Sequence, residues 1–170
     1  MNINTVSLIT AWQPDLIVSG GQSGADYGGL LGARDADIPT GGIAPAGFKT
    51  EYGPRPELGY LFGLVESESE SYDVRTIDNI KMVCAVILIT GVATSPGSRL
   101  TERMAHKYSK PLFPVDVPRL PTLEKYLLVE DIRSWLTQIR PSVLMIAGNR
   151  ESVCPGIEQW TRQLLTKVFA

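Results

Sequence analysis

The sequence has few of the residues that build disulfide frameworks, metal centres or histidine-based active sites. It contains two cysteines, Cys84 and Cys154, without a C-x-x-C pair, and a single histidine, His106. This excludes a disulfide framework and a zinc ribbon, and we predict no metal held directly by side chains. No Ser-His-Asp, Cys-His or H-E-x-x-H set can be assembled around His106, which we expect on the surface. Cys84 lies inside an apolar run, so we expect it to be buried.

Long apolar runs and an excess of one charge are also missing. The longest uninterrupted apolar run covers Met82 to Ile89, whereas a membrane span needs roughly 20 apolar residues. The first basic residue is Arg34, although a secretory signal places basic residues before its apolar stretch. The formal net charge is −2, which gives a polyanion no general attraction. We therefore expect a cytoplasmic protein whose partners include neither nucleic acid nor a membrane.

The length and composition favour one globular domain over residues 1–170. A domain averages roughly 150 residues, and the chain has 170, of which 44% are hydrophobic and 20% charged. These fractions are typical of soluble globular proteins. A chain of this length can bury about 70% of its unfolded surface, so its core needs no disulfide or metal.

Short runs rich in Val and Ile alternate with segments of helical spacing, which is typical of β-α-β units around a parallel sheet. The predicted strands cover residues 15–19, 82–90, 112–115 and 143–147, and the predicted helices cover 24–34, 98–108, 132–139 and a last segment from 155. The run at 82–90 is apolar throughout and is predicted to lie mid-sheet. Residues 40–72 are rich in Gly, Pro and acids and are predicted to be a long irregular segment. Within it, the alternation of Glu66, Glu68 and Glu70 indicates an edge strand or a solvated turn.

The strongest pattern for a ligand site is Leu16–Asp26, where a strand runs into a glycine-rich turn and a helix. Gly20, Gly21 and Gly24 permit backbone angles and close approach that a Cβ would block, so amides at the helix start could face a phosphate. No Gly-Lys-Ser/Thr follows, which excludes a Walker A loop. The glycine spacing and the lack of an acid at 38–50 make a poor dinucleotide fingerprint. A tight turn without a ligand is the alternative.

Two other predicted strands also end in polar, glycine-containing segments. Gly97, Ser98 and Thr101 follow the strand at 82–90, and Asn149–Ser152 follow the last strand. Ligand crevices of open α/β sheets lie beyond the carboxyl ends of strands, so we expect these loops to face one crevice. There Arg150 could bind an oxyanion in bidentate fashion. Ordinary helix capping and a surface ion pair between Arg150 and Glu151 are the alternatives.

Five segments occur in the order found in one known family. They are SGGQSGAD at 19–26, PTGG at 39–42, YDVRTIDNI at 72–80, GSRLTERMAHKYSKP at 97–111, and AGNRES with PGI at 147–157. In these segments the chain resembles the putative molybdenum carrier family, itself similar to the group that includes the LOG phosphoribohydrolases and DNA-processing protein A. The resemblance implies an α/β, Rossmann-like three-layer fold with a mainly parallel sheet between helices. It also implies a phosphorylated ligand, either the molybdenum cofactor or a nucleotide, and a homodimer or homotetramer.

Carried over position by position, the resemblance also implies a set of binding residues. The set comprises Ser19, Gly20, Gly21, Gln22, Ser23, Gly24, Asp26, Thr40, Gly41, Gly42, Arg75, Thr76, Asn79, Gly97, Ser98, Thr101, Asn149, Arg150, Glu151 and Ser152. Thr40 to Gly42 are expected at the end of the second strand. The chain has Tyr27, Ala46, Cys84 and Asn149 where the family often has a basic residue, Lys, Asp and Pro. The two positive charges lost at Tyr27 and Ala46 would weaken the binding of an anion.

Three functions follow from these patterns. The first is a binding protein for a phosphorylated heterocycle, with Arg150 or Arg75 on the charge. The second is an enzyme that cleaves an N-glycosidic bond of a nucleotide, with Asp26 or Glu151 as the candidate catalytic residue and Arg75 or Arg99 on the phosphate. The phosphoribohydrolase signature P-G-G-x-G-T-x-x-E is only partly matched, with Met104 in place of its glutamate, so we expect binding without turnover. The third is a nucleotide sensor whose partners dock on residues 66–70.

Overall fold

The structure is a computed structural model that describes residues 12–91, 93–117 and 122–170. Its centre is a sheet of six strands in the order β5-β2-β1-β8-β6-β7. These strands are β1 (Leu16–Val18), β2 (Thr40–Ala44), β5 (Leu64–Glu66), β6 (Ala85–Thr90), β7 (Leu112–Asp116) and β8 (Val143–Gly148). Every neighbouring pair in this sheet is parallel. The predicted α/β class is confirmed.

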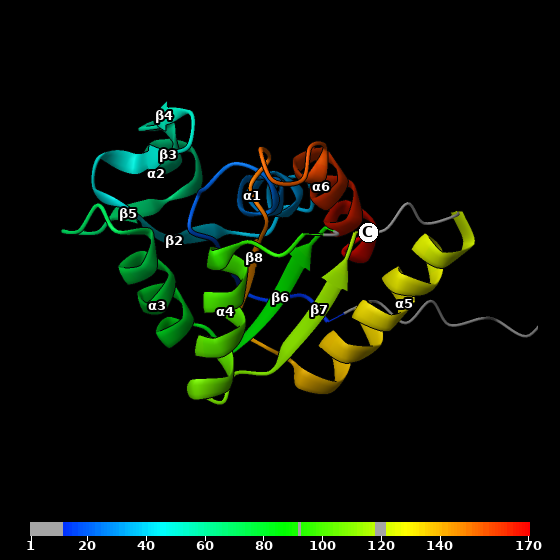
Figure 1. Ribbon diagram of the computed structural model, residues 1–170. Coiled ribbons are helices and arrows are strands. Elements are labelled where there is room, and N and C mark those ends of the chain that lie inside the picture. The colour runs from blue at the N-terminus through cyan, green and yellow to red at the C-terminus, as the bar shows by residue number, and fades with distance from the viewer. Residues whose placement is uncertain (1–11, 92, 118–121) are drawn as a thin grey trace, which may run out of the picture.

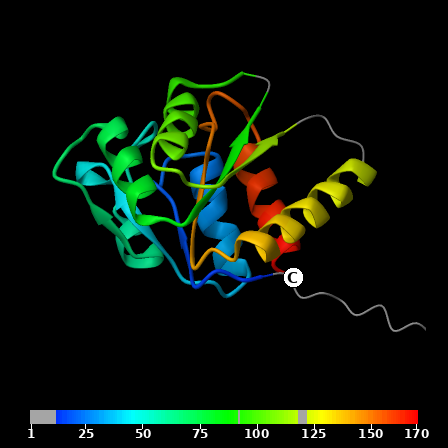
Figure 2. The same cartoon turned by 90° about the horizontal axis from the view of Figure 1, so that it is seen from below.

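Helices cover both faces of the sheet, which gives three layers (Figures 1 and 2). α1 (Ala25–Asp35), α5 (Thr122–Ile139) and α6 (Ile157–Val168) pack on one face, and α3 (Tyr72–Met82) and α4 (Pro96–Lys107) pack on the other. The short helix α2 (Glu57–Phe62) lies against β2, β5 and α1. Alternate residues of each central strand feed the two cores, because successive side chains of a strand point to opposite faces. In β6, Ile87 and Ile89 join the first core and Val86 and Leu88 join the second.

Most of the predicted elements are confirmed, with shifted ends, but Cys84 is an exception. The predicted strand at 82–90 starts only at Ala85, because α3 continues to Met82 and the chain turns at Val83 and Cys84. The predicted burial of Cys84 is therefore wrong. The residue is exposed, and its Sγ lies 3.4 Å from Ser142 Oγ. His106 is exposed, as expected.

The prediction of an irregular segment at 40–72 is also wrong. The segment contains β2, a 3₁₀ turn η1 (Ala46–Phe48), a hairpin of β3 (Lys49–Thr50) and β4 (Gly53–Pro54), α2 and β5. The three alternating glutamates, Glu66, Glu68 and Glu70, lie partly in an edge strand and partly in an exposed segment after it. Glu66 ends the edge strand β5, whereas Glu70 lies in a solvated turn and pairs with Lys49 at 3.5 Å.

The order of the strands brings three loops together at one end of the sheet. From β1 the chain continues to β2 on one side, while β8 lies on the other side of β1 and pairs with β6. The strand order thus reverses at β1 and β8, which is where parallel sheets bind ligands. In the described ranges, no helix is long and apolar enough to cross a membrane.

Candidate ligand-binding site

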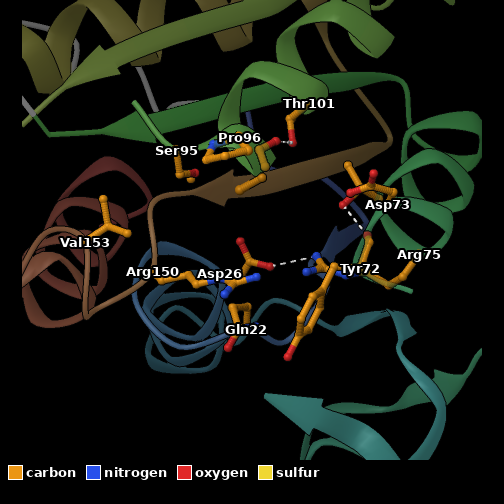
Figure 3. Close-up of a pocket in the computed structure, with 14 residues that line it drawn as sticks. Gln22, Asp26, Tyr72, Asp73, Arg75, Ser95, Pro96, Thr101, Arg150 and Val153 are labelled. Atoms are coloured by element: carbon orange, nitrogen blue, oxygen red, sulfur yellow. Dashed lines mark hydrogen bonds and ion pairs between the residues drawn. The ribbon is translucent and has the colours of Figure 1, made fainter. Parts of the chain in front are cut away.

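A pocket of about 260 Å³ lies beyond the carboxyl ends of β1, β6 and β8 (Figure 3). It is lined by Gln22, Asp26, Tyr72, Asp73, Arg75, Thr76, Ser95, Pro96, Gly97, Thr101, Ala147, Gly148, Arg150 and Val153. The β1–α1 loop, the starts of α1, α3 and α4, and the end of β8 with its following loop all contribute. Three of the predicted ligand segments therefore meet, as the sequence predicts.

A buried ion pair forms one wall of the pocket. Arg75 on α3 donates from Nη1 to Oδ2 of Asp26 on α1 at 3.1 Å (Figure 3), and their side chains are 8% and 5% exposed. The guanidinium group lies directly on the backbone of Gly20, where a Cβ would be 1.5 Å from Arg75 Nη1. The lack of a Cβ at Gly20 therefore provides the space that the Arg75 side chain occupies.

Burial controls the protonation of Asp26. It raises the pKa of this carboxyl, whereas Arg75 and the backbone amides of Gln22 and Gly148 lower the pKa. The net shift is upward, because burial in low dielectric disfavours the charged form.

Three amides in and next to the glycine-rich loop donate to acceptors inside the protein. Gly21 donates to Ser19 Oγ at 3.2 Å, Ser23 to Gln22 Oε1 at 3.0 Å, and Ala25 to the carbonyl of Asn149 at 3.0 Å. The positive φ of 80° at Gly24 brings the loop within reach of the Asn149 carbonyl. The β1–α1 loop is therefore hydrogen-bonded to the chain that follows β8.

The start of α4 presents its backbone to the pocket. Ser95 caps this twelve-residue helix, and its Oγ accepts from the amide of Ser98 at 3.1 Å. Pro96 has no N–H, so Gly97 carries the first amide of the helix, and a Cβ there would meet only Ser95 Oγ, at 3.8 Å. First-turn amides have no acceptor within their own helix and lie at its positive end. The start of α4 can therefore bind an anion.

Arg150 lies across the pocket from this helix start. Its Cζ is 4.6 Å from the centre of the Tyr72 ring, and no carboxylate of the described residues forms an ion pair with it. The alternative of a surface pair with Glu151 is therefore wrong. Glu151 instead accepts from the amides of Gly156 and Glu158 and holds the start of α6.

Two buried donors of the pocket residues find no acceptor among the described residues. They are Nε2 of Gln22 and Nε of Arg75. The orientation of the Gln22 amide is settled by its oxygen, which accepts from the backbone of Ser23 at 3.0 Å and of Glu51 at 2.9 Å. An unpaired buried donor costs about 1–3 kcal/mol, so both groups favour an acceptor supplied from outside.

The structure divides the predicted binding residues into two groups. Gln22, Asp26, Arg75, Thr76, Gly97, Thr101 and Arg150 line the pocket. Residues with structural contacts elsewhere are Ser19, Gly20, Gly21, Ser23, Gly24, Thr40, Gly41, Gly42, Asn79, Ser98, Asn149, Glu151 and Ser152.

The two asparagines of the second group use their amides to hold elements together. Asn79 accepts from the amide of Ile43 at 2.9 Å and donates to the carbonyl of Ile43 at 2.8 Å. Asn149 accepts from Ser98 Oγ at 2.8 Å and donates to the carbonyl of Ala93.

Thr40 to Gly42 lie at the beginning of β2, so their expected place at a strand end is wrong. Thr40 donates from Oγ1 to the carbonyl of Phe62 at 2.9 Å, which ties the start of β2 to the end of α2.

Sequence reasoning missed seven residues that line the pocket, namely Tyr72, Asp73, Ser95, Pro96, Ala147, Gly148 and Val153. Tyr72 and Asp73 begin the segment at 72–80, and Ser95-Pro96 is a typical helix start that could have been recognised. Glu51 was also missed, because its partners are distant in sequence. Burial raises the pKa of Glu51, but hydrogen bonds from Ser152 and Ser23 outweigh burial and lower the pKa below its usual value.

The chain is similar in sequence and in fold to known proteins. The family described as the circularly permutated YpsA SLOG family matches residues 17–169. A solved structure of a putative molybdenum carrier protein from Syntrophus aciditrophicus SB is similar at 34% sequence identity and a TM-score of 0.81, covering 92% of this chain and 94% of that one. No curated protein matches the chain.

Proposed function

Because the chain belongs to the circularly permutated YpsA SLOG family, we propose that it is a binding protein for a small phosphorylated ligand, held in the pocket beyond β1, β6 and β8. The candidate ligands are the molybdenum cofactor, which is a phosphorylated pterin that carries the metal, and a nucleotide. The name of the solved relative favours the first.

The phosphate is assigned to the start of α4. The Gly97 amide and the positive end of a twelve-residue helix face the pocket there, and Arg150 supplies an unpaired guanidinium group. Helix starts and bidentate arginines are the usual phosphate ligands of proteins. The glycine-rich loop supports this assignment, since its amides at Gly21, Ser23 and Ala25 donate to acceptors of the protein itself.

The observation that carries the proposal is a set of donors on the pocket wall that have no acceptor among the described residues. Nε2 of Gln22, Nε of Arg75 and the guanidinium of Arg150 find no acceptor among the described residues. A ligand rich in oxygen acceptors satisfies these groups, whereas a cation or an apolar molecule does not.

The size and remaining walls of the pocket suit one heterocycle. Its volume of about 260 Å³ is slightly below the roughly 300–1,000 Å³ of typical drug-sized sites. Tyr72 and Val153 offer aromatic and apolar surface to a flat ring. A pterin or a single nucleobase meets these limits better than a dinucleotide.

The test is native mass spectrometry of freshly purified protein, followed by thermal-shift titration with molybdenum cofactor, AMP, GMP and inorganic phosphate. A ligand at one hundred times its dissociation constant stabilises by about 2.7 kcal/mol. Arg150→Ala should bind more weakly and lose most of this stabilisation. Arg103→Ala, which removes an exposed arginine of α4 that does not line the pocket, is the control and should keep it.

Stabilisation by the cofactor alone identifies a carrier, and stabilisation by a nucleotide alone identifies a nucleotide-binding protein. If no ligand stabilises the wild type, or if Arg150→Ala and Arg103→Ala behave alike, the proposed site is wrong.

N-glycosidic hydrolysis of a nucleotide is the second candidate function, and the raised pKa of Asp26 in the pocket wall favours it. Against it, Asp26 is held by Arg75, and Glu151 is used at the start of α6. Chromatography of AMP and GMP incubated with the protein measures release of the base. If Asp26→Asn kept ligand affinity while base release stopped, the enzyme would replace the carrier.

A further inference from the structure

The hairpin of β3 and β4 contributes one carboxylate that bridges two loops of the pocket. Glu51 lies at its turn, and its Oε1 accepts from Ser23 Oγ and from the amide of Ser152, the latter at 3.2 Å. Its Oε2 accepts from Ser152 Oγ. Ser23 belongs to the β1–α1 loop and Ser152 to the β8–α6 loop, so one side chain joins three segments that are far apart in sequence.

These contacts reach the ligand site through neighbouring residues. The amide of Glu51 donates to Gln22 Oε1 at 2.9 Å, which directs the unpaired Nε2 of Gln22 away from the hairpin. On the other loop, Ser152 follows Arg150 by two residues, and the Glu151 amide between them donates to Ser23 Oγ at 3.3 Å. Glu51 thus fixes the loops that carry two donors of the pocket.

We propose that Glu51 is a positioning residue of the ligand site. Its hydrogen bonds to Ser23 and Ser152 connect the β1–α1 and β8–α6 loops, and this connection, the Glu51 clasp, holds Gln22 and Arg150 in place. This inference rests on the proposed function. Glu51 does not line the pocket, so it acts through its neighbours. Charge-assisted hydrogen bonds are stronger than neutral ones, and a carboxylate accepts several at once. The charge of Glu51 is therefore part of its role.

Substitution of Glu51 should therefore lower the affinity for the ligand, although Glu51 itself does not line the pocket. Removing residues that orient direct ligands typically costs 10–100-fold in metal affinity or activity, and we expect Glu51→Ala to weaken GMP or cofactor binding by roughly tenfold or more on the same grounds. Glu51→Gln keeps the shape but not the charge, and should give a smaller loss. Glu57→Gln is the matched control, because Glu57 pairs with Arg55 at 2.8 Å and touches neither loop.

Two measurements separate positioning from general stability. Isothermal titration with GMP and with molybdenum cofactor gives affinity, and a double-mutant cycle with Arg150→Ala gives coupling. If Glu51 acts through Arg150, Glu51→Ala should weaken binding much less in the Arg150→Ala background than in the wild type. Equal losses in both backgrounds would overturn the proposal.

Hydrogen exchange of the unliganded protein tests the clasp without any ligand. Exchange at residues 20–24 and 149–153 should accelerate together in Glu51→Ala and stay unchanged in Glu57→Gln. Ser152→Ala removes one donor and serves as a second variant if Glu51→Ala does not fold. Unchanged exchange at 149–153 in a folded Glu51 variant would refute the clasp. If wild type binds no ligand while exchange accelerates as expected, the proposed function fails and the clasp stands.

Discussion

At the residue scale, Gly20 constrains the pocket through its contact with Arg75, which lines the pocket. The guanidinium group of Arg75 occupies the space that any side chain at residue 20 would take. Glycine before a helix usually indicates close approach of a phosphate, and the sequence favours that interpretation here. The actual neighbour comes from α3, and a local pattern carries no information about an arginine that far along the chain.

We expect Gly20→Ala to destabilise the protein by about 3 kcal/mol, because the displaced guanidinium group leaves Asp26 as a buried, unpaired charge. The midpoint of urea unfolding measures this change. Gly41→Ala is the control, since a Cβ at residue 41 would lie 3.6 Å from its nearest neighbour, in ordinary contact. If the two variants unfolded at the same urea concentration, the packing of Arg75 on Gly20 would not be needed for stability.

At the element scale, Asn79 of helix α3 forms hydrogen bonds to the sheet in addition to the apolar packing of Ile80. Asn79 bonds both backbone groups of Ile43 in β2 and is fully buried. We expect Asn79→Ala to cost about 1–3 kcal/mol for each backbone group left unpaired, measured as the free energy of unfolding. Because α3 carries Tyr72 and Arg75, ligand-induced thermal stabilisation should decrease too. Asp78→Ala, an alteration of the preceding and less buried residue, should change neither quantity by a comparable amount.

Helices α1 and α6 are joined at their surface by an ion pair that makes stability depend on pH. Arg162 donates to both carboxylate oxygens of Asp35, at 2.6 and 3.0 Å, and these bonds lower the pKa of Asp35 from its usual 3.8. A lowered pKa means that the pair stabilises the fold fully above the usual pKa of 3.8, and that this contribution is lost as the pH falls from that value through the lowered pKa of the folded state.

Asp35→Asn should therefore lose stability at pH 7 and show a flatter decline than wild type as the pH falls below about 4.5, through 3.8 and toward the lowered pKa of Asp35. Unfolding free energies across this range measure both curves. Asp37→Asn, at an exposed position of positive φ that asparagine tolerates, should follow the wild-type curve. Parallel curves for wild type and Asp35→Asn would show that the pair has no part in the pH response.

The sequence predicts the continuous apolar strands and amphipathic helices well, and fails where elements are short or glycine-rich. β2 reads Thr-Gly-Gly-Ile-Ala and α2 spans only Glu57–Phe62, so neither shows a periodic pattern. Their stability comes from tertiary contacts such as the Phe62 carbonyl with Thr40. The same limit applies to the site. The lining loops were found from their glycines and Arg150, whereas Glu51 acts only through long-range bonds.

At the scale of the whole molecule, apolar side chains gather beside one edge of the sheet. Tyr60, Leu61 and Val65, on α2 and the edge strand β5, are 77%, 49% and 60% exposed.

Light scattering should give a mass of two or four times 18.6 kDa, in keeping with the expected homo-oligomer. Tyr60→Glu with Val65→Lys should shift this mass toward that of one chain, and Met82→Glu, at an apolar site on α3 that is 46% exposed, should not. A wild type of 18.6 kDa would contradict the expectation.

The pairing of β1 with β8 also determines when the pocket can form during synthesis of the chain. Ile17 pairs with Leu144 in the middle of the sheet, and β8 separates β1 from β6. During synthesis the ribosome releases β1 first, and the central gap closes only after β8 has emerged. Contacts between segments so distant in the chain form slowly and leave a partial sheet exposed in the meantime. A nascent chain that ends before β8 (Val143–Gly148) therefore lacks one wall of the pocket, and the unpaired edges of β1 and β6 favour aggregation until that strand is made.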